Sequence, residues 1–160
     1  MSFSTTHISL KLEQLTNGTS SGGVMGNIWF VADDYTFPEA HWSDFAEIIT
    51  GWWISALIDV YRSKGKWHEK SLLFMDGPCE VILRNGSATT VHFVYDGIVR
   101  SSFSISLLTF TKEIIHHRRH LLNLAIEAGW RQSAYSDLEH CDWLETLVQQ
   151  AQNKASRPVN

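Results

Sequence analysis

The sequence predicts an α+β fold, in which a mostly antiparallel sheet of about six strands packs against a long central helix and two C-terminal helices. The stretch from Phe37 to Arg62 carries apolar side chains at helical spacing and includes an uncharged run from Ile48 to Ile58. Residues 71–108 form short alternating segments separated by turn sequences, and two further helical patterns follow. The predicted order is ββ-α-ββββ-αα, in one domain spanning residues 1–160.

Composition and charge narrow the class of protein. The chain has 160 residues, 44% hydrophobic and 19% charged, which is typical of a globular domain that folds without metals or disulfides. Its net charge of −4 argues against nucleic-acid binding and favours a basic partner.

Cys79 and Cys141 are too few for a secreted disulfide scaffold. The N-terminus lacks a signal-peptide pattern, and the Ile48–Ile58 run is too short to cross a bilayer. We therefore predict a cytoplasmic protein.

Two strands are predicted before the central helix. From His7 to Leu15 apolar and polar residues alternate, which indicates a strand with one buried face. The connection from Thr16 to Asn27 is rich in Gly, Ser, Thr and Asn and predicts a flexible loop. Ile28–Ala32 then forms a second strand, antiparallel to the first, which ends at Asp33-Asp34.

The central helix is predicted over Phe37–Arg62. Thr36 and Glu39 have the spacing of a capping box, and Pro38 fits the first turn because its missing N–H is not needed there. Gly65 follows the helix and suits a left-handed cap. Five residues share the predicted buried face: Trp42, Phe45, Ile49, Trp52 and Ala56.

Four strands in close succession are predicted next. Asn85-Gly86 is a strong hairpin sequence, and Asp96-Gly97 marks the following turn. Polar residues alternate with apolar ones, as expected for an antiparallel sheet with one solvated face. The predicted strands are Ser71–Met75, Cys79–Leu83, Thr89–Tyr95 and Val99–Leu108.

Two helices are predicted to close the chain. The first spans Phe110–Ala128, with Gly129 as its cap. The second begins at a capping box formed by Ser136 and Glu139 and runs to about residue 153. The remaining residues, 154–160, are predicted to form a frayed tail.

The most concentrated polar cluster is the run from His116 to His120. His116 and His120 are four residues apart and share a helical face, which is suitable spacing for two metal ligands. The adjacent arginines repel a cation, and the sequence places no third ligand. We therefore predict no metal or other cofactor. The alternative is a polar helix surface that faces solvent or the acidic residues of the last helix.

Arg118 stands apart because its helical position lies on the predicted core face. It either extends its guanidinium to the edge of the core, pairs with a buried carboxylate, or lines a functional cleft. The last possibility defines an alternative function, a small enzyme or ligand-binding domain with a pocket near His116, His117 and Arg118. The chain carries no nucleophile, phosphate-loop or zinc-protease motif, so we do not predict an enzyme.

Acidic residues offer a different candidate surface. Five of them fall at or beside predicted strand ends, where Asp is also favoured by ordinary turn chemistry. Four more lie in the last helix without an intervening Lys or Arg. The candidate partner-binding residues are Asp33, Asp34, Glu39, Asp76, Asp96, Asp137, Glu139, Asp142 and Glu145.

Two segments carry a family resemblance. The segment Tyr35-Thr-Phe-Pro-Glu-Ala-His-Trp-Ser-Asp-Phe45, followed by Trp52, and the segment Leu73-Phe-Met-Asp-Gly-Pro78 resemble bacterial immunity proteins encoded beside polymorphic or contact-dependent growth-inhibition toxins. The similarity extends over about residues 28–130 as a pattern of elements. It implies a non-catalytic inhibitor that binds a toxin domain, often a nuclease, and blocks its active site. An acidic inhibitor suits a basic nuclease because carboxylates take the positions of phosphates.

Overall fold

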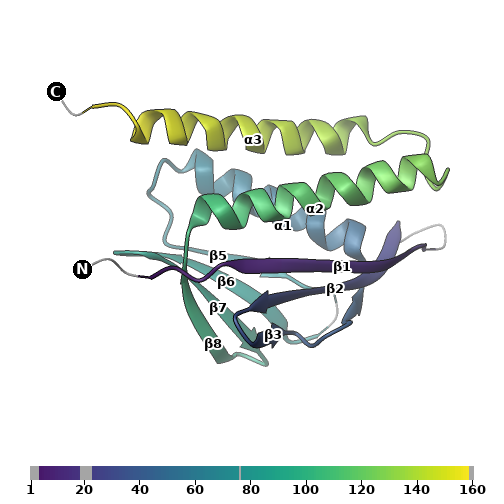
Figure 1. Ribbon diagram of the computed structural model, residues 1–160, viewed down its shortest axis with the longest axis horizontal. Helices are drawn as coiled ribbons and strands as arrows, with labels where there is room; N and C mark the ends of the chain where they lie inside the picture. Colours follow the sequence, from purple (N-terminus) through teal and green to yellow (C-terminus); the bar gives the residue numbers. More distant parts are fainter. Residues whose placement is uncertain (1–3, 19–22, 76, 159–160) are drawn as a thin grey trace.

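The computed structural model describes residues 4–18, 23–75 and 77–158. These residues form three helices and eight strands (Figure 1). In chain order they are β1 (Ile8–Asn17), β2 (Val24–Ala32), β3 (Tyr35–Phe37), β4 (Ser43–Asp44), α1 (Ala46–Arg62), β5 (Glu69–Leu73), β6 (Cys79–Asn85), β7 (Thr89–Tyr95), β8 (Ile98–Ile105), α2 (Leu107–Glu127) and α3 (Tyr135–Ala155).

The strands form two antiparallel sheets of four strands each, so the α+β class is confirmed and the single six-stranded sheet is wrong. In the first sheet β2 pairs with β1 and with the short strands β3 and β4. The second sheet is the meander β5-β6-β7-β8. The sheets meet through side chains: the rings of Phe37 and Phe93 lie 5.0 Å apart, and those of Phe30 and Phe93 lie 6.1 Å apart.

The start of the central helix also differs from the prediction. Helix α1 begins at Ala46, and the predicted capping box of Thr36 and Glu39 does not form, because residues 35–37 pair with β2 instead. Phe37 is buried and the Phe37–Pro38 peptide bond is cis. Trp52, predicted on the buried face, is 44% exposed. The buried stripe of α1 includes Ile49, Trp53, Leu57 and Val60.

The predicted loop from Thr16 to Asn27 is wrong at both ends, because β1 extends to Asn17 and β2 begins at Val24. The remaining elements lie close to their predicted positions. The four meander strands are present, and β7 has the predicted bounds. Helix α2 begins three residues earlier than predicted, where Ser106 accepts a hydrogen bond from the Thr109 N–H at 3.2 Å. Helix α3 begins at Tyr135, so Ser136 lies inside the helix and the box predicted for Ser136 and Glu139 does not form. The helix extends to Ala155, into the predicted tail.

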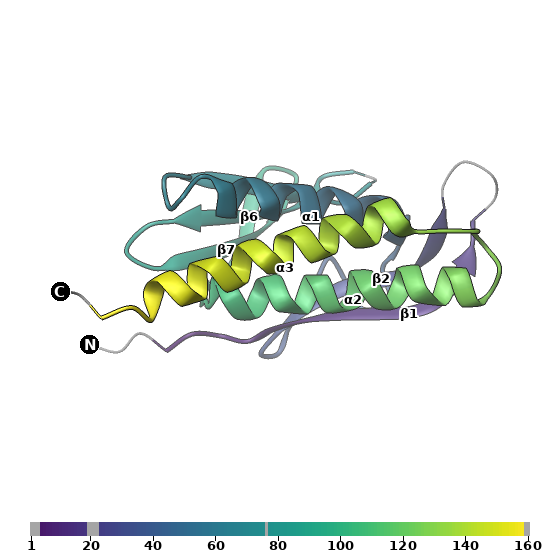
Figure 2. The ribbon, with the colours of Figure 1, turned by 90° about the horizontal axis from the view of Figure 1, so that it is seen from above.

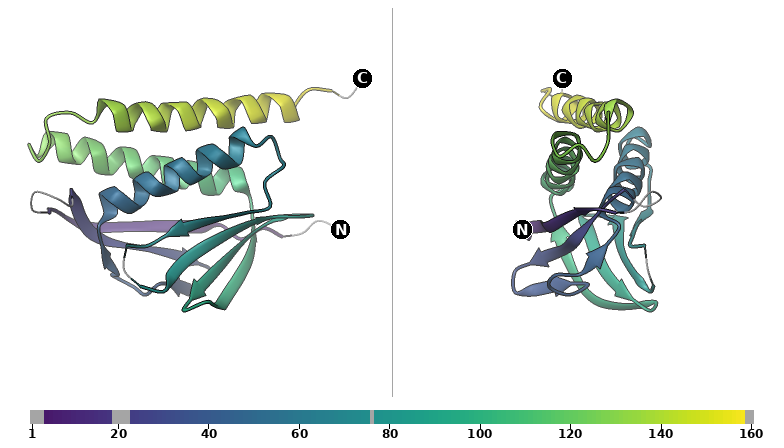
Figure 3. Two further views of the ribbon diagram at one scale, coloured as in Figure 1. Left: turned by 180° about the vertical axis from the view of Figure 1, so that it is seen from behind. Right: turned by 90° about the vertical axis from the view of Figure 1, so that its right-hand side faces the viewer.

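The three helices cover one side of the two sheets (Figure 3). Helices α1 and α3 run in the same direction and α2 runs in the opposite direction (Figure 1). Seen from above, α3 lies across α1 and α2 and is the outermost element (Figure 2). In the described part of the chain, no helix has the length and apolar character needed to cross a membrane.

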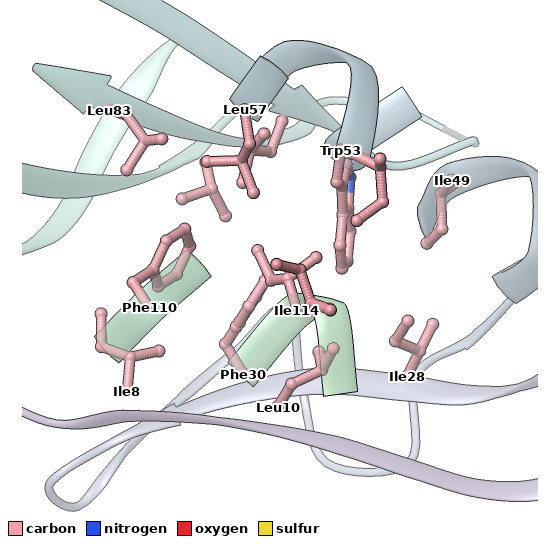
Figure 4. Packing of buried hydrophobic residues seen from close by; sticks show 14 of the residues in the cluster. Ile8, Leu10, Ile28, Phe30, Ile49, Trp53, Leu57, Leu83, Phe110 and Ile114 are labelled. Carbon is pink, nitrogen blue, oxygen red and sulfur yellow. The ribbon is translucent and has the colours of Figure 1, made fainter. Parts of the chain in front are cut away.

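The core lies between the sheets and the inner faces of α1 and α2 (Figure 4). The fully buried ring of Trp53 stacks on Phe30 at 5.2 Å, and Phe30 stacks on Phe110 at 5.9 Å. The Trp53 indole N–H donates to the carbonyl of Leu73 at 2.8 Å, which satisfies the polar atom that this side chain buries. The central helix is therefore fixed to both sheets and to α2.

Candidate functional site

Arg118 on α2 is the buried charge that links the three helices. Its side chain is only about 5% exposed. The guanidinium donates to the backbone carbonyl of Glu47 and to the Thr50 hydroxyl, the latter at 3.0 Å, and it lies 3.4 Å from an oxygen of Asp137. Burial lowers the pKa of Arg118, while the carboxylate of Asp137 acts in the opposite direction. Of the roles considered for Arg118, the structure shows the buried ion pair.

A second arginine completes this cluster. Arg131, in the loop between α2 and α3, pairs with Glu47 and lies 2.8 Å from the other oxygen of Asp137. The second carboxylate oxygen of Glu47 accepts a hydrogen bond from the Val24 N–H at 2.6 Å. Two arginines and two carboxylates therefore compensate one another while joining α1, α2, α3 and the start of β2.

An open cleft of about 500 Å³ lies beside this charged cluster. Its lining includes Trp52 from α1 and His140 from α3, together with the four charged residues. Among the described residues, no buried side-chain nitrogen or oxygen lacks a hydrogen-bond partner. The guanidinium groups are already paired with carboxylates, so the arrangement joins helices and offers no uncompensated cation to a ligand.

The histidines of α2 do not converge on this cleft. His116 and His120 are exposed. A ring nitrogen of His117 forms a hydrogen bond of 2.9 Å with the backbone carbonyl of Glu113 in its own helix. In residues 4–18, 23–75 and 77–158, no three His, Cys, Asp or Glu side chains are gathered in a way that could hold a metal ion. The weak alternative of a site at His116 and His120 thus has no third protein ligand there.

The acidic residues predicted in α3 are largely neutralised within the molecule. Asp137 pairs with Arg118 and Arg131, as described above. Asp142 lies 2.7 Å from a guanidinium nitrogen of Arg119, which also pairs with Glu145. The hydrogen bond that Arg119 donates to the Glu145 carboxylate is the main cause that raises the pKa of Arg119. Glu139 is exposed and takes part in none of the ion pairs found in the described residues.

The acidic turn residues occupy separate places on the two sheets. Asp33 and Asp34 form the turn between β2 and β3, whereas Asp96 lies in the turn between β7 and β8. Glu39 follows β3, and Asp76 lies outside the described residues. The four described residues are exposed, and no ion pair within the described chain involves them. Their charge is therefore available to a partner.

Exposed apolar side chains lie at the end of the second sheet that carries the Asp96 turn. Leu73, Tyr95, Ile98 and Val99 are 44–56% exposed. The strand register places these four residues at one end of the second sheet. Leu73, Glu80, Val94 and Val99 are successive partners across the four strands, and Tyr95 pairs with Ile98. Because successive residues of a strand point to opposite faces, the register puts Tyr95 and Ile98 on one face of this end and Leu73 and Val99 on the other. We call this end of the second sheet, formed by Leu73, Tyr95, Asp96, Ile98 and Val99, the turn surface. An apolar group of this kind with a charged border is typical of protein-binding sites.

Glu39 adds negative charge near this end of the second sheet. Burial is the main cause that raises the pKa of the Cys79 thiol, and the carboxylates of Asp44 and Glu39 raise it further. Cys79 is the partner of Tyr95 in the register of β6 and β7. The sequence predicted the acidic turn residues but not their apolar neighbours. The available signal was the run of Tyr95, Ile98 and Val99 on both sides of the Asp96-Gly97 turn.

A histidine outside the predicted sites forms a small polar cluster on the second sheet. The ring nitrogens of His92 lie 2.6 Å from the Ser102 hydroxyl and 3.0 Å from the Thr90 hydroxyl. This resembles the pairing of a base with a nucleophile, but no carboxylate hydrogen-bonds to His92 among the described residues. None of these three residues lines the cleft beside Arg118.

Comparison of the chain with family models, curated proteins and solved structures found no match.

Proposed function

We propose that this protein is an immunity protein that binds and neutralises a cognate bacterial toxin domain by occluding its active site. The observation that carries the proposal is the turn surface, where exposed apolar side chains border a carboxylate without an internal ion pair. The sequence resemblance described above supplies the biological context. The proposed toxin is a basic domain such as a nuclease, and no cofactor takes part.

The turn surface suits this role better than the acidic face of α3. In α3 three of the four predicted carboxylates already pair with arginines of the same chain. A partner lysine would have to compete with those arginines. At the turn surface, Asp96 forms no ion pair among the described residues, and Ile98 and Tyr95 provide exposed apolar contact area. The guanidinium carbon of Arg100 lies 5.6 Å from the centre of the Tyr95 ring, so this ring already has one cation of the same chain beside it.

The alternative of a small enzyme or ligand-binding domain rests on the cleft beside Arg118. That cleft holds His140 and Trp52 next to two arginines, which is the observation in its favour. It is opposed by the pairing of both guanidinium groups with Glu47 and Asp137. We therefore retain the toxin-binding proposal as the main one.

The direct test is co-expression of the chain with the toxin domain encoded next to it, followed by pull-down and measurement of the dissociation constant. We expect a complex with one copy of each protein. The double variant Asp96→Lys with Ile98→Asp should weaken binding by about tenfold or more, because it removes an apolar contact and places like charges opposite each other. A control variant, Glu127→Lys, changes an exposed carboxylate outside this surface and should bind normally. Absence of any complex with the neighbouring toxin would contradict the proposal.

A further inference from the structure

We propose that the cleft where α1 and α3 end binds a small amphipathic anion, an apolar chain that carries one carboxylate head group. Both helices end on the same side of the molecule as the C-terminus (Figure 1). The cleft also contacts the hairpin between β6 and β7 and the start of α2. This hairpin lies at the opposite end of the second sheet from the turn surface, so the inference does not depend on the proposed toxin binding.

The cleft has the size and apolar surface that a small ligand requires. Its volume is about 870 Å³, within the range of small-molecule sites. Its lining includes the buried side chains of Val60 and Trp67 and the partly buried side chains of Leu107 and Leu147. Ala151 contributes a small side chain from the exposed side of α3. An apolar chain lying against these side chains would bury part of its surface, which favours binding.

All the charged side chains that line the cleft are positive. Arg62, Lys64 and Lys154 line it, and none of its fourteen lining residues is acidic. Arg62 lies over the ring of Trp143, with its guanidinium carbon 5.5 Å from the ring centre. Within the described residues, Lys64 and Lys154 form no ion pair. In a chain with a net charge of −4, this gathering of unpaired cations beside an apolar cleft is complementary to an anion with an apolar body.

A simpler role explains part of this arrangement. Arg62 and Lys154 lie in the last turns of α1 and α3, where cations stabilise the negative ends of helix dipoles. That role requires no cavity, whereas here the two helix ends and Lys64 surround an apolar cleft of about 870 Å³. If the lysines only stabilised the helices, changing them would lower the free energy of unfolding and leave ligand binding unchanged.

The head group and the chain make separate contributions that can be tested independently. The carboxylate is placed near Lys64 and Lys154 at the exposed rim, and the chain lies against Trp67 and Leu147. An uncharged ester of the same chain retains the apolar contact and loses the ionic one. Inorganic phosphate retains charge and loses the apolar contact. Only a ligand with both parts should bind well.

The test uses the full chain and a fluorescent long-chain fatty acid as the probe, with its methyl ester and inorganic phosphate as comparisons. We expect saturable binding of one fatty acid per chain, and binding at least about tenfold weaker for the ester. The double variant Lys64→Glu with Lys154→Glu should weaken fatty-acid binding about tenfold. Ala151→Trp should also reduce binding, because the indole fills the cleft while every charge is kept.

Controls separate this site from general effects. Lys112→Glu alters an exposed lysine of α2 outside the cleft and should leave fatty-acid binding unchanged. Thermal unfolding of each variant shows whether it is folded before its binding is compared. The proposal is overturned if the fatty acid does not bind, if the ester binds equally well, or if Lys112→Glu has the same effect as the double variant. Binding to anionic phospholipid vesicles without binding of the free fatty acid would also overturn it.

Discussion

At the scale of single residues, hydrogen bonds and an ion pair stabilise the buried positive charge of Arg118. Arg118 places a guanidinium among the helices, and its donors reach a backbone carbonyl, a hydroxyl and a carboxylate. Gly51 leaves the space for it: a Cβ atom at that position would lie 3.2 Å from a terminal nitrogen of Arg118. A glycine inside a helix is otherwise unfavourable relative to alanine by about 1 kcal/mol. Its presence in α1 is thus explained by the arginine that packs against it.

His92 should make the stability of the protein depend on pH. Burial lowers its pKa from the ordinary value of 6.5, the charge of Arg84 lowers it further, and Glu69 acts in the opposite direction. The unfolded chain therefore takes up a proton at a higher pH than the folded protein, so the free energy of unfolding falls as the pH decreases from about 6.5 through the lowered pKa of the folded state. We expect His92→Gln to reduce this loss.

The measurement is chemical unfolding of both proteins at several pH values between about 7.5 and 5, a range that brackets the ordinary histidine pKa. The variant controls for the seven other histidines, because it retains all of them. Equal changes in the free energy of unfolding for the two proteins would contradict the assigned role of His92.

At the scale of elements, Asp137 holds α3 to the rest of the protein. Its two oxygens contact Arg118 and Arg131, which come from α2 and from the loop after it. Replacement by Asn in Asp137→Asn keeps the shape and removes the charge that compensates Arg118. We expect the free energy of unfolding to fall by about 2 kcal/mol, because a buried cation loses its carboxylate.

Asp142→Asn provides a matched comparison on the same helix. The Asp142 side chain is 71% exposed, and Arg119 also pairs with Glu145. The expected loss is no more than about 0.5 kcal/mol, since exposed ion pairs contribute little. Urea unfolding of the two variants measures both values. Equal losses would show that the buried position of Arg118 does not determine the energy of its pairing.

The strands show which elements can be predicted from local sequence and which cannot. The meander was predicted because Asn85-Gly86 and Asp96-Gly97 mark turns between alternating segments, and this information is local. Strands β3 and β4 were missed because three and two residues are too few to show a period, and their pairing with β2 depends on tertiary contacts. For the same reason, the local capping pattern at Thr36 was overridden by pairing with β2.

The same difference between local sequence patterns and long-range contacts applies to the candidate sites. Arg118 was correctly placed on the core face of its helix, and pairing with a carboxylate was among its predicted roles. Glu47 and Arg131 were missed because they are 84 residues apart in the sequence, so no spacing rule connects them. Only part of the turn surface was predicted. Its acidic residue, Asp96, follows from turn chemistry, whereas the exposure of Leu73 and Ile98 can be recognised only once the register of the whole sheet is known.

At the scale of the whole molecule, both sheets and all three helices contribute to one continuous cluster of buried side chains. Phe30 of the first sheet contacts Phe93 of the second sheet, Trp53 of α1 and Phe110 of α2. Disrupting either sheet would expose the core surface of the other. We therefore expect the described part of the chain to unfold in one cooperative transition, although it contains two separate sheets.

This prediction is tested by following urea unfolding with circular dichroism, which reports the helices and sheets, and with tryptophan fluorescence, which reports buried side chains such as Trp53. The two curves should coincide in the parent protein. Ile114→Ala, which opens a cavity at a fully buried position of α2, should lower the free energy of unfolding by about 3 kcal/mol and shift both curves together. The conservative change Ile114→Val should shift them by about 1 kcal/mol. Two separate transitions, with only one of them displaced by Ile114→Ala, would show that the sheets unfold independently in spite of their shared core.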